Sequence, residues 1–372
     1  MKIKYFKTIS SVIFLLVFFI GIAGAAFAGE IKLRMGTTWV PALTTLYGAD
    51  VNFVKIINTL CKGEVKIRLY SAGEVVSAFE TFGAVQDNTL QLGGDVPFYW
   101  VGKNTAFGPL GALPMGINQM DLIDWIYQGG GFELYNEIYG KFGLVYFPYN
   151  VLPPESGIRG KKKITNVKDY KGMKIRMAGQ IQGKILKDLG AAPVMVSATE
   201  IYQALERGMI DGAEGGGPTL DIMLGLDETT TEWNGPGWHQ PSSVGGVMMN
   251  KKVWDKLSPS IQAKFKYAAM ANMLWATTNS NSADYDNAEK FAERKIGVNI
   301  LDDKSLANIE QLAYKHFEDE AERNPLFAKV VYSQYEYYKK TTLYKKIQQG
   351  ILNRPVTTPN MAKLKAAAEK AK

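Results

Sequence analysis

The sequence predicts a two-domain α/β fold with a helical C-terminal region. The chain has 372 residues, which is enough for two domains of ordinary size. Strand-like runs of alternating apolar residues are separated by helix-length segments, a pattern typical of a mixed or parallel sheet covered by helices. A proline-rich stretch, residues 148–158, interrupts this pattern and predicts a crossing between the two domains.

Residues 1–28 have the pattern of a cleaved export signal. Three lysines within residues 1–7 precede an apolar run that ends in Ala26-Phe27-Ala28, an A-x-A cleavage site. The run is close to the roughly 20 residues that span a bilayer, so an uncleaved anchor is the alternative. The small residues near its end favour cleavage after Ala28, which predicts a periplasmic mature protein.

The first domain is expected to open with a β-α-β unit. Residues 31–36 and 65–70 alternate as strands, and the segment between them, 43–61, has the length of a helix. Residues 143–147 form another apolar strand, which we expect to end at Pro148.

A second α/β block follows the proline-rich crossing. Its expected elements are a strand at 173–177, a helix at 180–189, a strand at 194–196, a helix at 199–207 and a strand at 209–211. From about residue 257 the composition is helical, apart from a strand-like segment at 297–301. We therefore expect one domain from residues 29–155 plus 243–283, and the other from 156–242 plus 284–372.

Composition excludes several classes of function. With one cysteine and two histidines, the chain can form neither an internal disulfide nor a His/Cys metal site, so we expect no zinc or thiol-redox chemistry. Three of the positive charges behind the net +7 lie in residues 1–7, so no nucleic-acid partner is expected. No nucleophile with a matching base stands out, which argues against an enzyme.

Arg176 is the strongest candidate for ligand binding. It lies near the carboxyl end of the expected strand 173–177, where open α/β sheets gather their ligands. The helix expected to begin after Gly179 adds N–H groups that favour anions. A guanidinium can hold a carboxylate through two parallel hydrogen bonds. The alternative is a surface arginine in a salt bridge worth about 0–1 kcal/mol.

Glu214 lies in a glycine-rich loop that follows the expected strand 209–211. Such a loop lets a backbone approach a ligand closely. The loop lacks the Lys-Ser/Thr of a phosphate-binding loop, so nucleotide binding is not expected. Glu214 is a candidate metal ligand or hydrogen-bond acceptor, and a solvated loop carboxylate is the alternative.

Arg176 is followed by Ile201-Tyr202-Gln203-Ala204-Leu205, Gly208, Ile210-Asp211-Gly212 and Glu214. The order of these features resembles the solute-binding proteins of TRAP transporters, the DctP-type family. Within the family the chain is similar to the mannitol/chloroaromatic branch, whose ligands include 2-oxo acids and lactate. Further matching segments lie at 72–76, 99–104, 125–131, 141–144, 236–239, 250–254 and 324–327.

The resemblance implies a periplasmic-binding-protein-like fold with a ligand cleft between the domains. Such a protein captures a small-molecule carboxylate, such as a 2-oxo or 2-hydroxy acid, by domain closure and delivers it to the two membrane permease subunits. A solute sensor for a signalling receptor has the same fold and is the alternative. A periplasmic enzyme acting on organic acids is a more remote one.

The resemblance also assigns roles to individual residues. Arg176 matches the arginine that pairs with the ligand carboxylate. Arg159 matches a glutamine that contacts ligand and cation, which implies either a second guanidinium in the cleft or a correspondence displaced by a few residues. Gln240 stands where the branch has a glutamate that helps hold sodium or calcium. We therefore expect Arg176 and Arg159 to bind the carboxylate without a required cofactor, and Glu214 and Gln240 to hold Na or Ca if an ion binds.

The remaining candidates are departures from the branch and aromatic residues. Asp95 replaces an uncharged polar residue, and is expected either to bind the solute or to pair with an arginine. Gly215 replaces a large aromatic that walls the pocket, so a longer solute is expected to fit. Trp39, Tyr99 and Trp238 are candidate apolar walls or core residues. The aromatic segment 331–338 is expected either to form a homodimer contact or to pack on its own domain.

Overall fold

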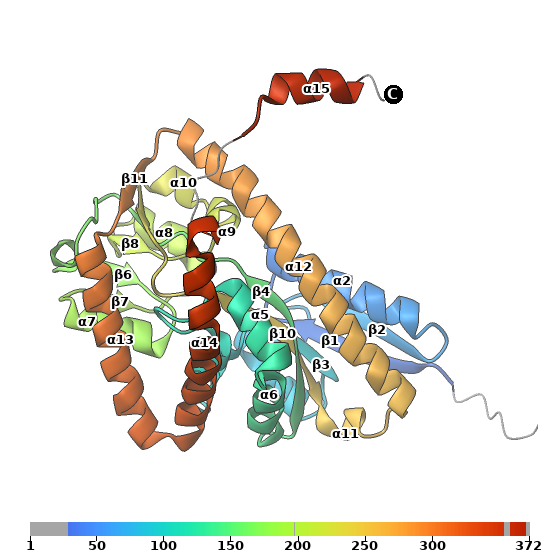
Figure 1. Cartoon of the computed structure of the whole chain (residues 1–372). Coiled ribbons are helices and arrows are strands. Elements are labelled where there is room, and N and C mark those ends of the chain that lie inside the picture. Colours follow the sequence, from blue (N-terminus) through green and yellow to red (C-terminus); the bar gives the residue numbers. More distant parts are fainter. Residues whose placement is uncertain (1–28, 197, 353–357, 370–372) are drawn as a thin grey trace, which may run out of the picture. The chain divides into compact units, whose positions relative to one another are not determined.

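A computed structural model describes residues 29–196, 198–352 and 358–369 of the chain (Figure 1). The expected export signal at residues 1–28 lies outside the described residues. Among the helices of the described part, none combines the length and apolar character needed to cross a membrane. The described residues form two mixed sheets covered by helices, which confirms the predicted α/β fold class.

The first sheet has five strands in the order β2-β1-β3-β10-β4. Their bounds are β1 Ile31–Thr37, β2 Val65–Tyr70, β3 Leu92–Asp95, β4 Leu144–Leu152 and β10 Ser243–Asn250. β1 lies parallel to β2 and β3, whereas β10 runs antiparallel to β3. The helical elements that accompany this sheet in the chain are α2 Thr44–Leu60, the 3-10 turn Ala78–Glu80, α3 Thr81–Gln86, α11 Lys251–Trp254 and the long α12 Pro259–Glu293.

The second sheet has six strands in the order β11-β9-β5-β8-β6-β7. Their bounds are β5 Ile158–Gly160, β6 Lys174–Arg176, β7 Ala192–Val194, β8 Gly212–Ala213, β9 Glu232–Gly235 and β11 Gly297–Ile300. β6 is parallel to both β7 and β8, and β5 is antiparallel to β8 and β9. The carboxyl ends of β6 and β8 therefore lie at the same edge.

Among the described residues, three of the other helices lie between β3 and β4 in the chain, and the rest lie between or after the strands of the second sheet. They are α4 Phe107–Gly111, α5 Gln119–Gln128, α6 Gly131–Gly140, α7 Gln180–Asp188, α8 Ile201–Glu206, α9 Pro218–Met223, α10 Leu226–Thr229, α13 Asp303–Arg323, α14 Pro325–Leu352 and α15 Met361–Glu369. Short 3-10 turns occupy Pro97–Trp100, Val167–Tyr170 and Ala198–Glu200. α13 packs against α7 and α14, and α14 also packs against α4 and α5 (Figure 1).

The chain divides into two compact units. Of the described residues, the first holds 29–95, 139–150 and 246–276, and the second holds 96–138, 151–196, 198–245, 277–352 and 358–369. The sequence-based division instead assigned residues 96–138 to the first domain. These residues cluster with the second unit because α4 and α5 pack on α14.

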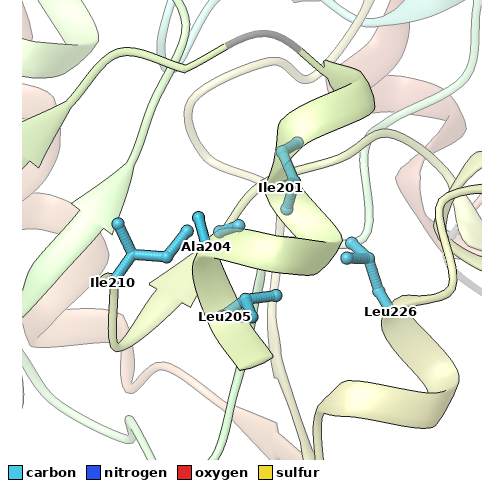
Figure 2. Close-up of a cluster of buried hydrophobic side chains, with 6 residues drawn as sticks. Ile201, Ala204, Leu205, Ile210 and Leu226 are labelled. Atoms are coloured by element: carbon cyan, nitrogen blue, oxygen red, sulfur yellow. The ribbon is translucent and has the colours of Figure 1, made fainter. Parts of the chain in front are cut away.

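A compact apolar cluster supports the glycine-rich loop that follows β8. Ile201, Ala204 and Leu205 of α8 pack against Ile210 and Leu226, with Ala213 completing the cluster (Figure 2). The first three lie on one face of α8 because residues three and four apart are neighbours on a helix. Burying each large aliphatic side chain contributes about 1.5–3 kcal/mol. The cluster thereby fixes the start of the loop at β8 and its return at α10.

Most predicted elements are present, with shifts at their ends. The expected strands 31–36 and 65–70 correspond to β1 and β2, and the expected helices 43–61 and 180–189 to α2 and α7. The expected strand 194–196 is β7, two residues earlier. The predicted end of a strand at Pro148 is wrong, because β4 continues to Leu152. β4 is the last strand of its sheet, and an edge strand tolerates a residue without an N–H donor.

Candidate functional site

Arg176 and Glu214 meet because their strands are neighbours. Arg176 is the last residue of β6, and its Cα partner across the sheet is Ala213 of β8. Glu214 follows Ala213 and therefore leaves the sheet at the edge where β6 ends. Ala178, two residues after Arg176, leads into α7 at this same edge.

The Arg176 guanidinium is held by three oxygens. Its Nη1 lies 2.5 Å from Glu214 Oε1 and donates to the Glu214 carbonyl at 3.1 Å, while Nε donates to the Val196 carbonyl at 3.2 Å. The Ala178 N–H also donates to Glu214 Oε1 at 2.5 Å. Arg176 is 6% exposed and Glu214 1%, so this is a buried ion pair and not a surface salt bridge.

A second carboxylate, Glu155, adjoins this pair. Its Oε2 lies 2.8 Å from His239 Nε2, and one ligand atom from each of Glu155, Glu214 and His239 lies within 4.8 Å of the others. Burial raises the pKa of Glu155, and the nearby Glu214 carboxylate raises it further, whereas His239 and Arg176 oppose the shift. The raised pKa is the electrostatic result of placing two carboxylates together away from water.

Backbone hydrogen bonds tie the segments of this cluster to one another. The Glu155 N–H donates to the Gln240 carbonyl at 3.1 Å, and the Ser156 N–H donates to the Gly216 carbonyl at 2.7 Å. Gln182 of α7 donates through Nε2 to the His239 carbonyl at 3.1 Å. The three loops that carry the acidic and imidazole groups are therefore fixed relative to α7.

Gln240 belongs to this network through its backbone carbonyl, and its side-chain amide oxygen is a further acceptor. The residue is 2% exposed, and its Oε1 has no hydrogen-bond partner among the described residues. A buried acceptor without a donor is costly unless a ligand satisfies it. Gln240 follows His239 directly, so its oxygen is a candidate third oxygen ligand beside the two carboxylates.

Trp238 is a buried residue of the same loop. It is 2% exposed, and its indole N–H donates to the Tyr170 hydroxyl at 3.0 Å. Its carbonyl accepts from the Met115 N–H at 2.7 Å. These two hydrogen bonds fix the position of the 236–240 loop.

Arg159 occupies a different environment from Arg176. It is 0% exposed, with its guanidinium 4.2 Å from the ring centre of Phe291 and 5.5 Å from that of Trp233. Its Nε lies 3.7 Å from the Asp221 carboxylate. Burial raises the pKa of Asp221 to about 8, and the Arg159 charge opposes that shift. In this conformation the Arg159 guanidinium is covered by protein, and Glu155 is the residue of its segment that adjoins Glu214.

Gly215 faces the interior of the second unit. A Cβ placed on it would lie 2.7 Å from Asp221 Oδ1 and 2.8 Å from Leu226 Cδ1. A side chain at this position therefore conflicts with the partner of Arg159 and with the apolar cluster of Figure 2. The glycine makes room for buried protein groups, and its small size therefore gives no support to a longer solute.

Three further sequence candidates are Asp95, Trp39 and Tyr99. Asp95, in the first unit, is 1% exposed and its Oδ2 accepts from the Tyr139 hydroxyl at 3.1 Å. Trp39, also in the first unit, is 7% exposed and belongs to the core. Tyr99 is half-buried, with its ring 5.3 Å from Phe98 and 6.3 Å from Trp100.

The first unit contains another buried acid, Asp50. Its two carboxylate oxygens accept hydrogen bonds from the Thr37 and Tyr149 hydroxyls. Burial raises the pKa of Asp50 well above its usual range, Thr37 opposes the shift, and the nearby Asp95 adds to it. The side chain is 1% exposed. These donors make Asp50 a structural link between β1, α2 and β4.

Sequence reasoning missed Glu155 and the role of His239. Glu155 ends the run Pro153-Pro154-Glu155 in a segment expected only to connect domains, so nothing marked it as a ligand. Its position four residues before Arg159 fits the displaced correspondence considered above. His239 carries no role in the sequence analysis, although its place between the candidates Trp238 and Gln240 is a signal that ties it to the site.

The cluster has the chemistry of a hard-cation and anion site. Two carboxylates and an amide oxygen are the donors that Na⁺ and Ca²⁺ prefer, and the buried guanidinium beside them suits a carboxylate. A cation bound to these oxygens would satisfy Gln240 Oε1 and separate the two neighbouring carboxylates, so the residues fit such an ion.

Comparison with known proteins identifies the family. Residues 35–323 match the family model described as bacterial extracellular solute-binding protein, family 7 (DctP). The chain is 32% identical, over 314 residues, to the monocarboxylate 2-oxoacid-binding periplasmic protein of Nostoc sp., covering 84% of this chain and 85% of that protein.

Two solved structures share the fold. A TRAP transporter solute-binding protein from Bordetella bronchiseptica, a mixed-occupancy dimer with copurified calcium and picolinate, has a TM-score of 0.82 at 26% identity and covers 92% of this chain and 100% of its own. A TRAP periplasmic solute-binding protein from Pseudoalteromonas atlantica with bound sodium and pyruvate has a TM-score of 0.82 at 26% identity, covering 88% and 100%. The chain described here belongs to the DctP family of TRAP-type extracellular solute-binding proteins.

Proposed function

We propose that this protein captures a small organic acid outside the cytoplasm and delivers it to a TRAP membrane permease. The observation that carries the proposal is the buried Arg176 guanidinium, fixed at the carboxyl end of β6 beside two carboxylates. The relatives named above bind pyruvate, picolinate or 2-oxo acids, which are all carboxylates.

Arg176 anchors the solute carboxylate. Its guanidinium is oriented by the Glu214 and Val196 carbonyls, so its remaining N–H groups have a fixed direction before the solute arrives. A pre-oriented donor loses little conformational entropy on binding. Each charge-assisted hydrogen bond contributes about 1.5–3 kcal/mol.

A sodium or calcium ion accompanies the solute. Ionised carboxylates at Glu155 and Glu214 repel a solute carboxylate that approaches Arg176 without a cation. Glu155, Glu214 and Gln240 would hold the ion, and its charge would offset theirs. His239 orients the Glu155 carboxylate through the 2.8 Å contact. Gln240 has no charge to offer the ion, and Glu155 supplies the second carboxylate in its place.

The test is a titration of the purified protein with C3–C6 oxo, hydroxy and dicarboxylic acids. Each acid is measured by calorimetry in sodium buffer, in choline buffer, and with calcium or chelator. The expected result is binding of a monocarboxylate class that weakens when sodium and calcium are both withdrawn. Binding that is indifferent to both ions would refute the cation role, and no binding of any acid by protein stripped of copurified solute would refute the proposed function.

The remaining parts of the proposal concern location and partners. We propose export with cleavage after Ala28, which mass spectrometry of the secreted protein would test. We also propose a homodimer formed through the C-terminal region. Residues 331–338 pack partly on their own unit, since Trp125 donates to Ser333 Oγ at 3.0 Å. Beyond them Leu343, Tyr344 and Ile347 are each at least 68% exposed on α14, and lysine substitutions there should abolish the dimer in light scattering.

A further inference from the structure

Two neighbouring strands of the first unit present four positive charges to solvent. β1 and β2 lie side by side in parallel, with Lys32 opposite Lys66 and Arg34 opposite Arg68 (Figure 1). All four side chains are exposed. Adjacent strands lie about 4.8 Å apart and alternate residues of a strand about 7 Å apart, so the four cations share one small patch. These four residues form the basic face.

Strand alternation places the basic face on the side of the sheet away from α2. Leu33 and Ile67 point to the other side and are buried. Thr37 lies on that same buried side, and its hydroxyl donates to the Asp50 carboxylate of α2. α2 therefore covers the sheet opposite the basic face.

The charges of the basic face are not neutralised within the part of the chain that the structure describes. None of its four side chains takes part in an ion pair there. Glu30 and Glu64 directly precede the two strands, but Glu64 pairs with Lys264. Like charges directly opposite one another destabilise a sheet. The arrangement therefore costs stability, which binding of an anionic partner would recover.

Tyr70, at the end of β2, holds the two arginines of the basic face together. The Arg68 guanidinium lies 4.8 Å from the centre of the Tyr70 ring, and the Arg34 guanidinium lies 5.7 Å from it. A guanidinium is attracted to the negative face of an aromatic ring. The ring thereby gathers two like charges that would otherwise move apart.

Protection of a sheet edge does not explain this pattern. Lysines on an edge strand prevent pairing with other chains. β1 is not an edge strand, because it pairs with both β2 and β3. The edge of β2 is already covered at Ile67, whose N–H donates to Asn58 Oδ1 at 2.7 Å and whose carbonyl accepts from Asn58 Nδ2 at 2.9 Å.

We propose that the basic face binds the anionic headgroups of a phospholipid membrane and holds the exported protein weakly at the membrane surface. This inference goes beyond the proposed function and does not depend on which solute binds. Each Lys or Arg near an anionic membrane strengthens binding about fivefold. Such binding raises the concentration of the protein where a membrane permease would receive the solute.

A lipid surface fits the basic face better than a protein partner does. The centre of a stable protein interface is apolar and depleted of lysine. Among the described residues of β1 and β2, none is a large exposed apolar residue. A lipid surface needs no apolar centre, because the charges alone attract it.

The experiment measures co-sedimentation of the exported protein with vesicles of phosphatidylcholine, either alone or with about a third of phosphatidylglycerol. The protein should bind the anionic vesicles and not the neutral ones at low ionic strength. Added salt should release it, because the screening length falls from about 30 Å at 0.01 M to about 3 Å at 1 M.

A charge-removal variant and a matched control locate the binding surface. Lys32→Gln combined with Lys66→Gln should weaken binding to anionic vesicles about 25-fold, at fivefold for each cation. Lys55→Gln combined with Lys266→Gln removes the same two charges from exposed positions of α2 and α12. α12 packs on α2, since Asn52 donates to Asn272 at 2.9 Å, so the control should change binding less than about threefold.

Several outcomes would overturn the membrane role. These are equal binding to neutral and anionic vesicles, no binding to anionic vesicles at low salt, and equal binding by the Lys32/Lys66 variant and its control. Binding of polyglutamate without binding of vesicles would assign the basic face to an acidic protein segment instead. The wild-type vesicle and salt series decides the matter even if the Lys32/Lys66 variant does not fold. None of these outcomes bears on solute binding through Arg176.

Discussion

Replacing Arg176 by methionine is the most informative single perturbation of the site. The change keeps an unbranched side chain and removes the guanidinium that contacts Glu214 at 2.5 Å and two backbone carbonyls. The solute should lose at least about 2 kcal/mol of binding free energy, because a charge-assisted hydrogen bond contributes about 1.5–3 kcal/mol. This loss corresponds to about a thirtyfold higher dissociation constant.

The same change should also lower stability, and the two effects must be separated. Glu214 is 1% exposed, so removing its partner leaves a buried charge, which costs about 3–5 kcal/mol of unfolding free energy. Adding Glu214→Gln to Arg176→Met should restore much of that stability, since neither group is then charged. The double variant should remain unable to bind the acid tightly.

Calorimetry and urea unfolding, carried out on the same preparations, measure the two effects. Arg207→Met is the control, because Arg207 is an exposed arginine at the end of α8 and the change should alter neither quantity. If Arg176→Met is folded at the assay temperature and binds the acid with the wild-type constant, the anchoring role of Arg176 is wrong.

Three further changes test other parts of the structure. Burial raises the pKa of Asp50, so the folded protein holds the Asp50 proton more tightly than the unfolded chain does. The unfolding free energy should therefore fall as pH rises from about 4 to the folded-state pKa, by at most about 1.4 kcal/mol per pH unit. Urea titrations at several pH values should show this slope for the wild-type protein and not for Asp50→Asn. Glu155→Gln should reduce calcium affinity at least tenfold by calorimetry, and retention of wild-type affinity would exclude Glu155 as a ligand. Gly215→Trp should destabilise the protein by about 1–3 kcal/mol or more in thermal unfolding, because its Cβ alone would lie 2.7 Å from Asp221; an unchanged melting temperature would contradict the inward direction of that position.

The place of Arg176 at the end of a strand could be predicted from the sequence, because the alternation over 173–177 marks a strand and β6 ends at Arg176. Local patterns also located β1, β2, α2 and α7. Patterns of this kind describe one segment at a time.

Contacts between segments far apart in the chain could not be predicted in this way. The family resemblance implies a second guanidinium in the cleft at Arg159, yet Asp221, Trp233 and Phe291 enclose this residue from three other segments. Glu155 reads as part of a connection, and only the fold places it beside His239, 84 residues later. Likewise, a side chain at position 215 would collide with Asp221, and only the fold shows that these two positions are neighbours.

The strand order of the first sheet has a consequence for synthesis of the chain. β10 lies between β3 and β4, although it follows β4 by some ninety residues in the sequence. β10 is the strand that links β4 to β2, β1 and β3. Until Ser243–Asn250 has left the ribosome, β4 therefore cannot join these three strands in one sheet. The sheet is therefore completed late, and its apolar edges remain open for most of translation. Such open edges make a nascent chain dependent on chaperones. A ribosome-bound fragment ending before residue 243 should accordingly be digested by protease throughout the first unit, and one extending past residue 276 by about 40 residues should resist.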